Sequence, residues 1–133
     1  MRPRNMNSLV LDASAILAFL LQEPGHDKIT TAMLTRAVAS SVNIAEVQAR
    51  LVREGGLPDE AWADARTTIQ RVVPFDENDA RVTGSLVAQT RHLGLSLGDR
   101  ACLSLGIALK APIYTADRSW KKLNLGIPIH VIR

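Results

Sequence analysis

The sequence predicts an α/β fold, a single-domain α/β/α sandwich with a central, mainly parallel sheet. Short apolar runs of strand length alternate with segments of helical period along the chain. These runs are too apolar for strands with one solvated face, so helices are expected to cover the sheet on both sides. A length of 133 residues suits one domain spanning 1–133. Residues 1–7 precede the first apolar run and are expected outside the core.

The first half of the chain supplies two predicted strands and four predicted helices. In order, these are a strand at 9–11, helices at 14–22 and 26–36, a strand at 37–39, a helix at 42–54 and a helix from 58 onward. Pro24-Gly25 ends the first helix and Gly55-Gly56 the third. Pro58 and the two acids after it open the fourth helix, because proline and negative charge both favour a helix N-terminus.

The second half supplies the remaining strands. We expect a strand at 72–73, a helix at 76–92, a helix at 96–110, a strand at 112–115, a short helix at 117–123 and a strand at 129–132. Pro74 interrupts the first of these strands, and Asp76 caps the helix that follows. Gly94 ends that helix, and Ser96 and Asp99 have capping-box spacing at the start of the next.

Composition excludes several classes of protein. Hydrophobic residues make up 47% of the chain and charged residues 22%, which excludes a disordered chain. A single cysteine excludes a disulfide scaffold and suits a reducing cytoplasm. Asp12 interrupts the one long apolar run, so no membrane-spanning helix is expected and the protein is expected to be cytoplasmic. The net charge of +3 fits a polyanionic partner and ordinary solubility equally well.

Common site fingerprints are missing. The first strand is followed by Asp12-Ala-Ser-Ala, not by a glycine-rich dinucleotide loop, and no phosphate-binding Gly-Lys-Ser/Thr loop occurs. The three histidines have no cysteine or histidine partner at metal-binding spacing. Cys102 is expected to fill the core and not to act as a nucleophile.

Four acidic residues lie where a site is expected. Asp12 and Asp117 each follow an apolar strand, so both should emerge at the carboxyl edge of the sheet. Asp99 lies in the first turn of a helix, and Glu46 lies on a helical polar stripe with Asn43. Each also has a purely structural explanation, as a helix cap, as a first-turn acid favoured by the helix dipole, or as one charge on a solvated face.

Taken together, the four acids suggest a metal site. Crowded carboxylates repel one another unless a cation neutralises them. Oxygen ligands without histidine or cysteine favour Mg²⁺ or Mn²⁺, ions that can activate a water for phosphodiester cleavage.

The pattern resembles the PIN-domain ribonucleases, and among them the VapC-type toxins of bacterial toxin–antitoxin pairs. The resemblance spans essentially the whole chain and is carried by four motifs in order, Leu9-Val-Leu-Asp12-Ala-Ser14-Ala, Asn43-Ile-Ala-Glu46-Val, Leu97-Gly-Asp99-Arg-Ala-Cys-Leu-Ser-Leu-Gly106 and Thr115-Ala-Asp117-Arg-Ser-Trp120. It implies a PIN-like α/β/α fold and a metal-dependent endoribonuclease acting as the toxin of such a pair. It also implies a small antitoxin partner and a homodimer.

The resemblance also implies roles for individual residues. The acidic quartet that binds Mg²⁺ or Mn²⁺ is matched by Asp12, Glu46, Asp99 and Asp117. Supporting polar positions are matched by Thr115, Ser14 and Asn43. We hypothesise that a metal-ordered water attacks an RNA phosphodiester and leaves 5′-phosphate and 3′-hydroxyl ends. The arginines near the quartet that could hold RNA phosphates are Arg50, Arg53, Arg100 and Arg118, although each is equally well explained as surface charge.

Three alternatives stay open. A non-catalytic PIN-like module that binds RNA or protein would share the fold, although the intact quartet argues against it. A phosphohydrolase of the haloacid-dehalogenase kind needs a second aspartate where Ser14 stands. A receiver domain needs an acidic pair before its first aspartate and a lysine after a late strand, whereas Lys110 precedes a strand.

Overall fold

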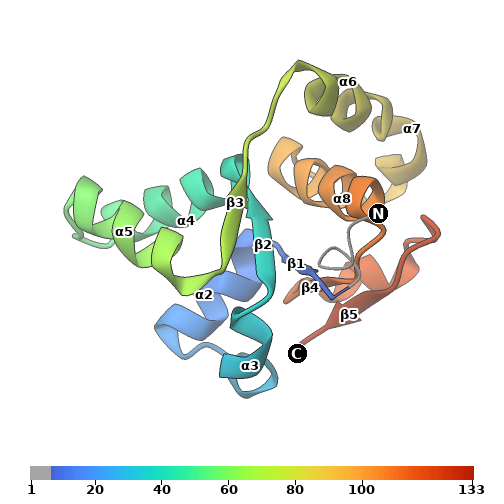
Figure 1. Ribbon diagram of the computed structural model, residues 1–133. Coiled ribbons are helices and arrows are strands. Elements are labelled where there is room, and N and C mark those ends of the chain that lie inside the picture. The colour runs from blue at the N-terminus through green and yellow to red at the C-terminus, as the bar shows by residue number, and fades with distance from the viewer. Residues whose placement is uncertain (1–6) are drawn as a thin grey trace.

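The computed structural model of the protein describes residues 7–133 and contains a five-stranded sheet between two layers of helices (Figure 1). The strand order is β3-β2-β1-β4-β5, and every neighbouring pair is parallel. The strands are β1 (Leu9–Leu11), β2 (Ala37–Ser40), β3 (Arg71–Val73), β4 (Ile113–Thr115) and β5 (Ile129–Val131). The prediction of an α/β/α sandwich with a parallel sheet is confirmed. The prediction that residues 1–7 lie outside the core falls, for 1–6, outside the described residues.

Helices cover both faces of the sheet, as the apolar strands require. One layer holds α2 (Ala13–Leu21), α3 (Thr31–Leu34), α4 (Ser41–Arg53) and α5 (Pro58–Thr68). On the other side of the sheet lie α6 (Glu77–Ser85), α7 (Val87–Thr90) and α8 (Leu97–Leu109). Short 3₁₀ turns complete the chain at η1 (His26–Lys28), η2 (Arg91–Leu93) and η3 (Arg118–Lys122). Among residues 7–133, no helix combines the length and the apolar character needed to cross a membrane.

Successive side chains of β1 point to opposite faces of the sheet, as expected for a strand that is buried on both faces. Leu9 and Leu11 belong to the cluster that packs beneath α2 and α4, and Val10 belongs to the cluster beneath α8. All three are fully buried. β1 is therefore the central strand, and both helical layers rest on it.

The predicted helix at 26–36 is wrong as one continuous element. The structure forms η1, an extended step and then α3. Ile29 is extended and 4% exposed in the core, and Thr30 begins a new helix because its hydroxyl accepts a 3.1 Å bond from the amide of Met33. Burial of Ile29 and the new cap together interrupt the helical period.

The predicted helix at 76–92 is also broken, into α6, α7 and η2. Gly84 lowers the helix propensity at the end of α6, and the carbonyl of Val82 accepts a 2.6 Å bond from the Ser85 hydroxyl besides the 3.2 Å bond from the amide of Leu86. Leu86 turns into the core at this break, and Gly94 ends the segment with a positive φ of 61°, as predicted. The helix predicted at 117–123 is the shorter 3₁₀ turn η3.

The sheet has its topological switch point at β1. This strand pairs with β2 on one side and with β4 on the other, so the connections from its two neighbours leave in opposite directions. In open parallel sheets, a crevice forms at the carboxyl ends of strands at such a point. Asp12 follows β1 and Asp117 follows β4 by two residues, which brings both to this crevice.

Candidate active site

Asp12 lies at the bottom of the crevice and is 4% exposed. It is the N-cap of α2, and its Oδ1 accepts bonds from the amide of Ala15 at 2.8 Å and from the hydroxyl of Ser14 at 2.7 Å. Its Oδ2 accepts a 2.6 Å bond from the Thr115 hydroxyl. Both oxygens are thus held, and the carboxylate has one defined orientation.

Two hydroxyls join the ends of β1 and β4 around this carboxylate. Ser14 accepts a 2.9 Å bond from the amide of Ala116, and Thr115 accepts a 3.1 Å bond from the amide of Asp117. The two hydroxyl oxygens are 3.3 Å apart. The structure therefore brings the predicted supporting residues Ser14 and Thr115 into one network with two of the acids.

Glu46 is held against the first turn of α8. The side-chain amide of Asn43 donates to Glu46 Oε1 at 2.9 Å and to the carbonyl oxygen of Gly98 at 3.0 Å. A Cβ atom at Gly98 would lie 2.1 Å from Glu46 Oε2, far inside van der Waals contact. Gly98 therefore makes room for the carboxylate. Sequence reasoning missed this residue, since nothing local shows that 46 and 98 meet.

The other two acids lie at helix starts, as expected. Asp99 occupies the third position of α8, and its Oδ2 accepts a 3.0 Å bond from the amide of Ser96. Asp117 caps η3, and its Oδ1 accepts bonds from the amide and the hydroxyl of Ser119 at 2.9 and 2.8 Å. Within residues 7–133, the hydrogen bonds to each of these two side chains go to a single oxygen.

The four acids meet in one cleft of about 270 Å³. Its lining comprises Asp12, Ala13, Ser14, Leu17, Glu46, Arg50, Arg53, Asp99 and Asp117. We call it the acid cleft. The predicted quartet thus comes together from four separate parts of the chain, on α4, on α8 and after β1 and β4.

Burial and mutual repulsion make it unfavourable to ionise the carboxylates of the acid cleft. Burial raises the pKa of Asp12 to about 6, against the hydrogen bonds from Thr115, Ala15 and Ser14, and the charge of Asp99 adds to the rise. Burial also raises the pKa of Glu46, and Asp99 again contributes. Burial, and after it the charges of three of these acids, raises the pKa of Cys102 well above its usual range. This thiol is buried and suits the core, as predicted.

The donor set fits a hard divalent cation, although the described residues contain no ready-made ligand cluster. Between residues 7 and 133, no three Asp, Glu, His or Cys side chains are close enough to hold an ion together. The cleft lining nevertheless offers four carboxylates and no histidine or cysteine, and the mutual repulsion of the carboxylates is relieved by positive charge. To hold one ion together, three of these carboxylates would have to lie closer to one another than they do in this structure.

The predicted phosphate-binding arginines are differently placed. Arg50 and Arg53 line the acid cleft, but Arg50 is paired with Glu23 at 2.9 Å and with Glu54. Arg118 lines an adjoining cleft. Arg100 instead reaches α6, where its Nη1 donates a 3.0 Å bond to the carbonyl of Thr83.

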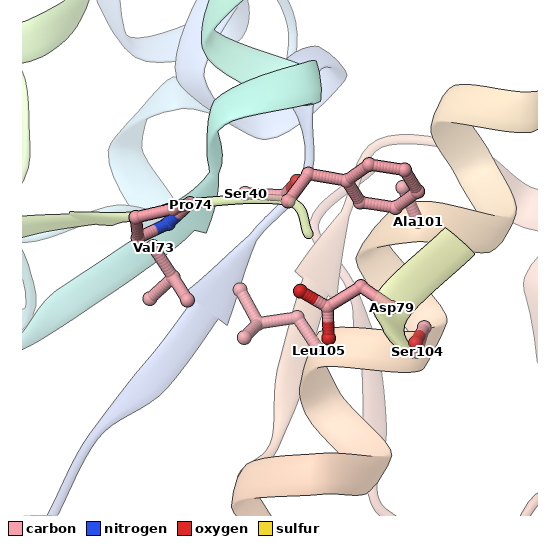
Figure 2. A pocket seen from close by; sticks show the side chains of 8 residues that line it. Ser40, Val73, Pro74, Asp79, Ala101, Ser104 and Leu105 are labelled. Carbon is pink, nitrogen blue, oxygen red and sulfur yellow. The ribbon is translucent and has the colours of Figure 1, made fainter. Parts of the chain in front are cut away.

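A separate cavity of about 10 Å³ lies between the end of β3 and helices α6 and α8 (Figure 2). Its lining is Ser40, Val73, Pro74, Phe75, Asp79, Ala101, Ser104 and Leu105. Such a volume holds about one water molecule. It is a packing defect beside the core and cannot receive a substrate.

Comparisons with known proteins identify a matching family and solved structures of similar fold. The profile of the PIN domain family matches residues 9–125. The fold is similar to that of DNA-bound VapBC from Salmonella typhimurium, with a TM-score of 0.70 and 18% identity over 95% of this chain and 98% of that one. A toxin–antitoxin complex from Klebsiella pneumoniae gives 0.70 and 15% over the same shares. VapBC2 from Rickettsia felis bound to a promoter DNA fragment gives 0.68 and 16%, over 94% and 98%. No curated protein matches the sequence.

Proposed function

Because the chain belongs to the PIN domain family, we propose that it is a metal-dependent endoribonuclease and the toxin of a toxin–antitoxin pair. The observation that carries the proposal is the acid cleft, in which four carboxylates from distant segments line one opening. The similarity in fold to solved toxin–antitoxin complexes supports the second half of the proposal.

The four acids of the cleft are assigned one role and differ in how firmly they are held. We assign Asp12, Glu46, Asp99 and Asp117 to holding Mg²⁺ or Mn²⁺, which when bound supplies an activated water and charge neutralisation for phosphodiester cleavage. Asp12 is the fixed member of the set, since both its oxygens are held from within the fold. The carboxylates of Asp99 and Asp117 each keep one oxygen that these capping bonds do not use.

The support around the quartet keeps these carboxylates oriented. Ser14 and Thr115 orient Asp12, and Asn43 orients Glu46. Such partners of metal ligands typically change metal affinity or activity 10–100-fold when removed.

A single assay tests the nuclease proposal without guessing the substrate. Purified protein is incubated with total bacterial RNA and Mn²⁺, beside Asp99→Asn and a chelator control, and new 5′-phosphate ends are mapped. We expect a few discrete ends in the wild type alone. Asparagine keeps the capping oxygen, so Asp99→Asn should stay folded while losing Mn²⁺ binding and cleavage. Full activity in Asp99→Asn, or no new ends from folded, metal-loaded wild type, would favour a non-catalytic PIN-like binding module.

The partner proposals need their own measurements. Exposed apolar side chains at the junction of α4 and α5, Val52, Leu57 and Trp62, are 37%, 62% and 38% exposed and suit a protein contact. We propose that the protein forms a homodimer and binds a small antitoxin. Light scattering of the free protein should give twice the monomer mass, and co-expression with a candidate antitoxin should abolish RNA cleavage. A monomer at all concentrations would refute the dimer.

A further inference from the structure

A second cleft adjoins the acid cleft and is larger, at about 570 Å³. It is lined by Ser14, Pro24, Ala116, Asp117, Arg118 and Arg133. Ser14 and Asp117 belong to both linings, so the two clefts meet at the carboxyl ends of β1 and β4. We call this second opening the arginine cleft.

The two arginines of this cleft can still bind an anion, whereas Arg50 is already paired with two carboxylates. Arg118 is exposed and follows Asp117 directly. Arg133 is oriented from within the fold, because its Nε donates a 3.1 Å bond to the carbonyl of Pro24 and its Nη2 lies 3.6 Å from Glu23 Oε1. A guanidinium held in this way keeps most of its donors and loses less entropy when it binds an anion. By contrast, two carboxylates, Glu23 and Glu54, already occupy Arg50.

The two clefts carry charges of opposite sign, and a nucleic acid strand bound at the site would contact both clefts. The acid cleft is rich in carboxylates, so before a cation binds it repels a phosphate. A strand with one phosphodiester at the acid cleft carries another phosphate on each side. The acid cleft is also lined by Arg50 and Arg53, but two carboxylates already pair with Arg50 and four acids share that lining. The arginine cleft has two arginines and one acid in its lining, and Arg133 is oriented by the carbonyl of Pro24.

We infer that the arginine cleft is a subsite for the phosphate of the nucleotide next to the scissile one, held by Arg118 and Arg133. This inference rests on the proposed nuclease function and extends it to the path of the RNA, which crosses Asp117 from one cleft to the other. Sequence reasoning selected Arg118 but missed Arg133, because the contact between residues 24 and 133 is invisible in the sequence.

The test measures binding and not cleavage. Fluorescence anisotropy follows the binding of a labelled single-stranded RNA of about ten nucleotides to the Asp99→Asn protein, so that the RNA stays intact. The substitutions Arg118→Gln and Arg133→Gln are compared, singly and together, with Arg81→Gln on the exposed side of α6 as a matched loss of one charge. Salt is varied from about 50 to 200 mM.

We expect the double variant to bind at least about 10-fold more weakly and its slope of log K against log salt to fall by about 0.7, the contribution of one phosphate in a single strand. Arg81→Gln should change neither.

The outcomes separate this inference from the proposed function. If the double variant binds the longer RNA as Arg81→Gln does, the subsite is refuted even where the wild type cleaves RNA. If the wild type never cleaves but the arginine variants still lose RNA binding, the subsite stands and the nuclease proposal fails. If an acidic peptide binds the parent protein more tightly than the double variant while both bind RNA equally, the cleft is a site for a protein partner and the inference is overturned.

Discussion

Substitution of Gly98 by alanine should disable the acid cleft without unfolding the protein. The added Cβ would lie 2.1 Å from Glu46 Oε2, 2.4 Å from its Cδ and 2.5 Å from its Oε1. Ordinary contact begins at 3.4 Å, so the carboxylate has to retreat by about 1 Å or more. The atoms in conflict are the far end of a flexible side chain, which yields more readily than backbone does. Ligand groups generally need placement within about 0.5 Å, so this displacement is decisive.

The stability of the fold should change little. Alanine is a better helix former than glycine, so α8 does not lose stability from the backbone. The Asn43 amide loses its bond to the displaced Glu46 but keeps the one to the carbonyl of residue 98. We therefore expect a melting temperature close to that of the wild type and a 10–100-fold loss of Mn²⁺ affinity.

Calorimetric titration of Mn²⁺ into the metal-free protein measures this loss directly, and a thermal melt checks the fold. Gly84→Ala is the matched control, since no atom lies within 4 Å of its added Cβ and its φ is not positive. The shorter side chain in Glu46→Asp leaves room for the methyl group, so adding Gly98→Ala to it should cost little more. Wild-type Mn²⁺ affinity in Gly98→Ala would refute the reasoning, and a lowered melting temperature would show that the helices separate instead.

Three further predictions concern the cleft and the core beneath it. Burial raises the pKa of Asp12 from 3.8 to about 6, so the folded state holds this proton more tightly than the unfolded chain does, and metal-free stability should fall by about 3 kcal/mol as pH rises through that interval. In a series of urea unfolding experiments at different pH values, Asp12→Asn should remove this pH dependence of stability and be more stable than the wild type at pH 7. An unchanged pH dependence would contradict the assignment. Ser14→Ala leaves the buried amide of Ala116 without its acceptor and should cost about 1–3 kcal/mol in the same experiment, whereas a neutral result would show that water replaces the hydroxyl. Cys102 should react with a thiol reagent only after denaturant is added, and rapid reaction of the native protein would contradict its burial and raised pKa.

Much of the fold was predictable because its signals are local. The strands are continuous apolar runs, and Asp12 and Asp117 follow two of them, so their meeting at one sheet edge needed only the parallel arrangement. The breaks at Ile29 and Leu86 were not predictable in the same way. Each of these residues has an apolar side chain that fits a helical period, and only the position of the core decides that the chain turns there.

The contacts that complete the site are long-range, and no local pattern reveals them. Gly98 looks like an ordinary first-turn residue until the packing of α8 on α4 places it against Glu46. Arg133 likewise gains its orientation from Pro24, at the far end of the chain. Sequence reasoning therefore found the charged groups, whereas the space and the orientation they require depend on how distant segments pack.

The structural and the functional explanations of these acids are compatible. Asp12 and Asp117 are N-caps and Asp99 completes a capping box, and all three still line the acid cleft. A helix start at a sheet edge needs an acceptor for its free amides and favours negative charge, so each cap also delivers a carboxylate to the crevice. Asparagine accepts the same capping bond without the charge. Aspartate-to-asparagine substitutions at these three positions should therefore preserve the helices while removing the charge, which separates the two roles by experiment.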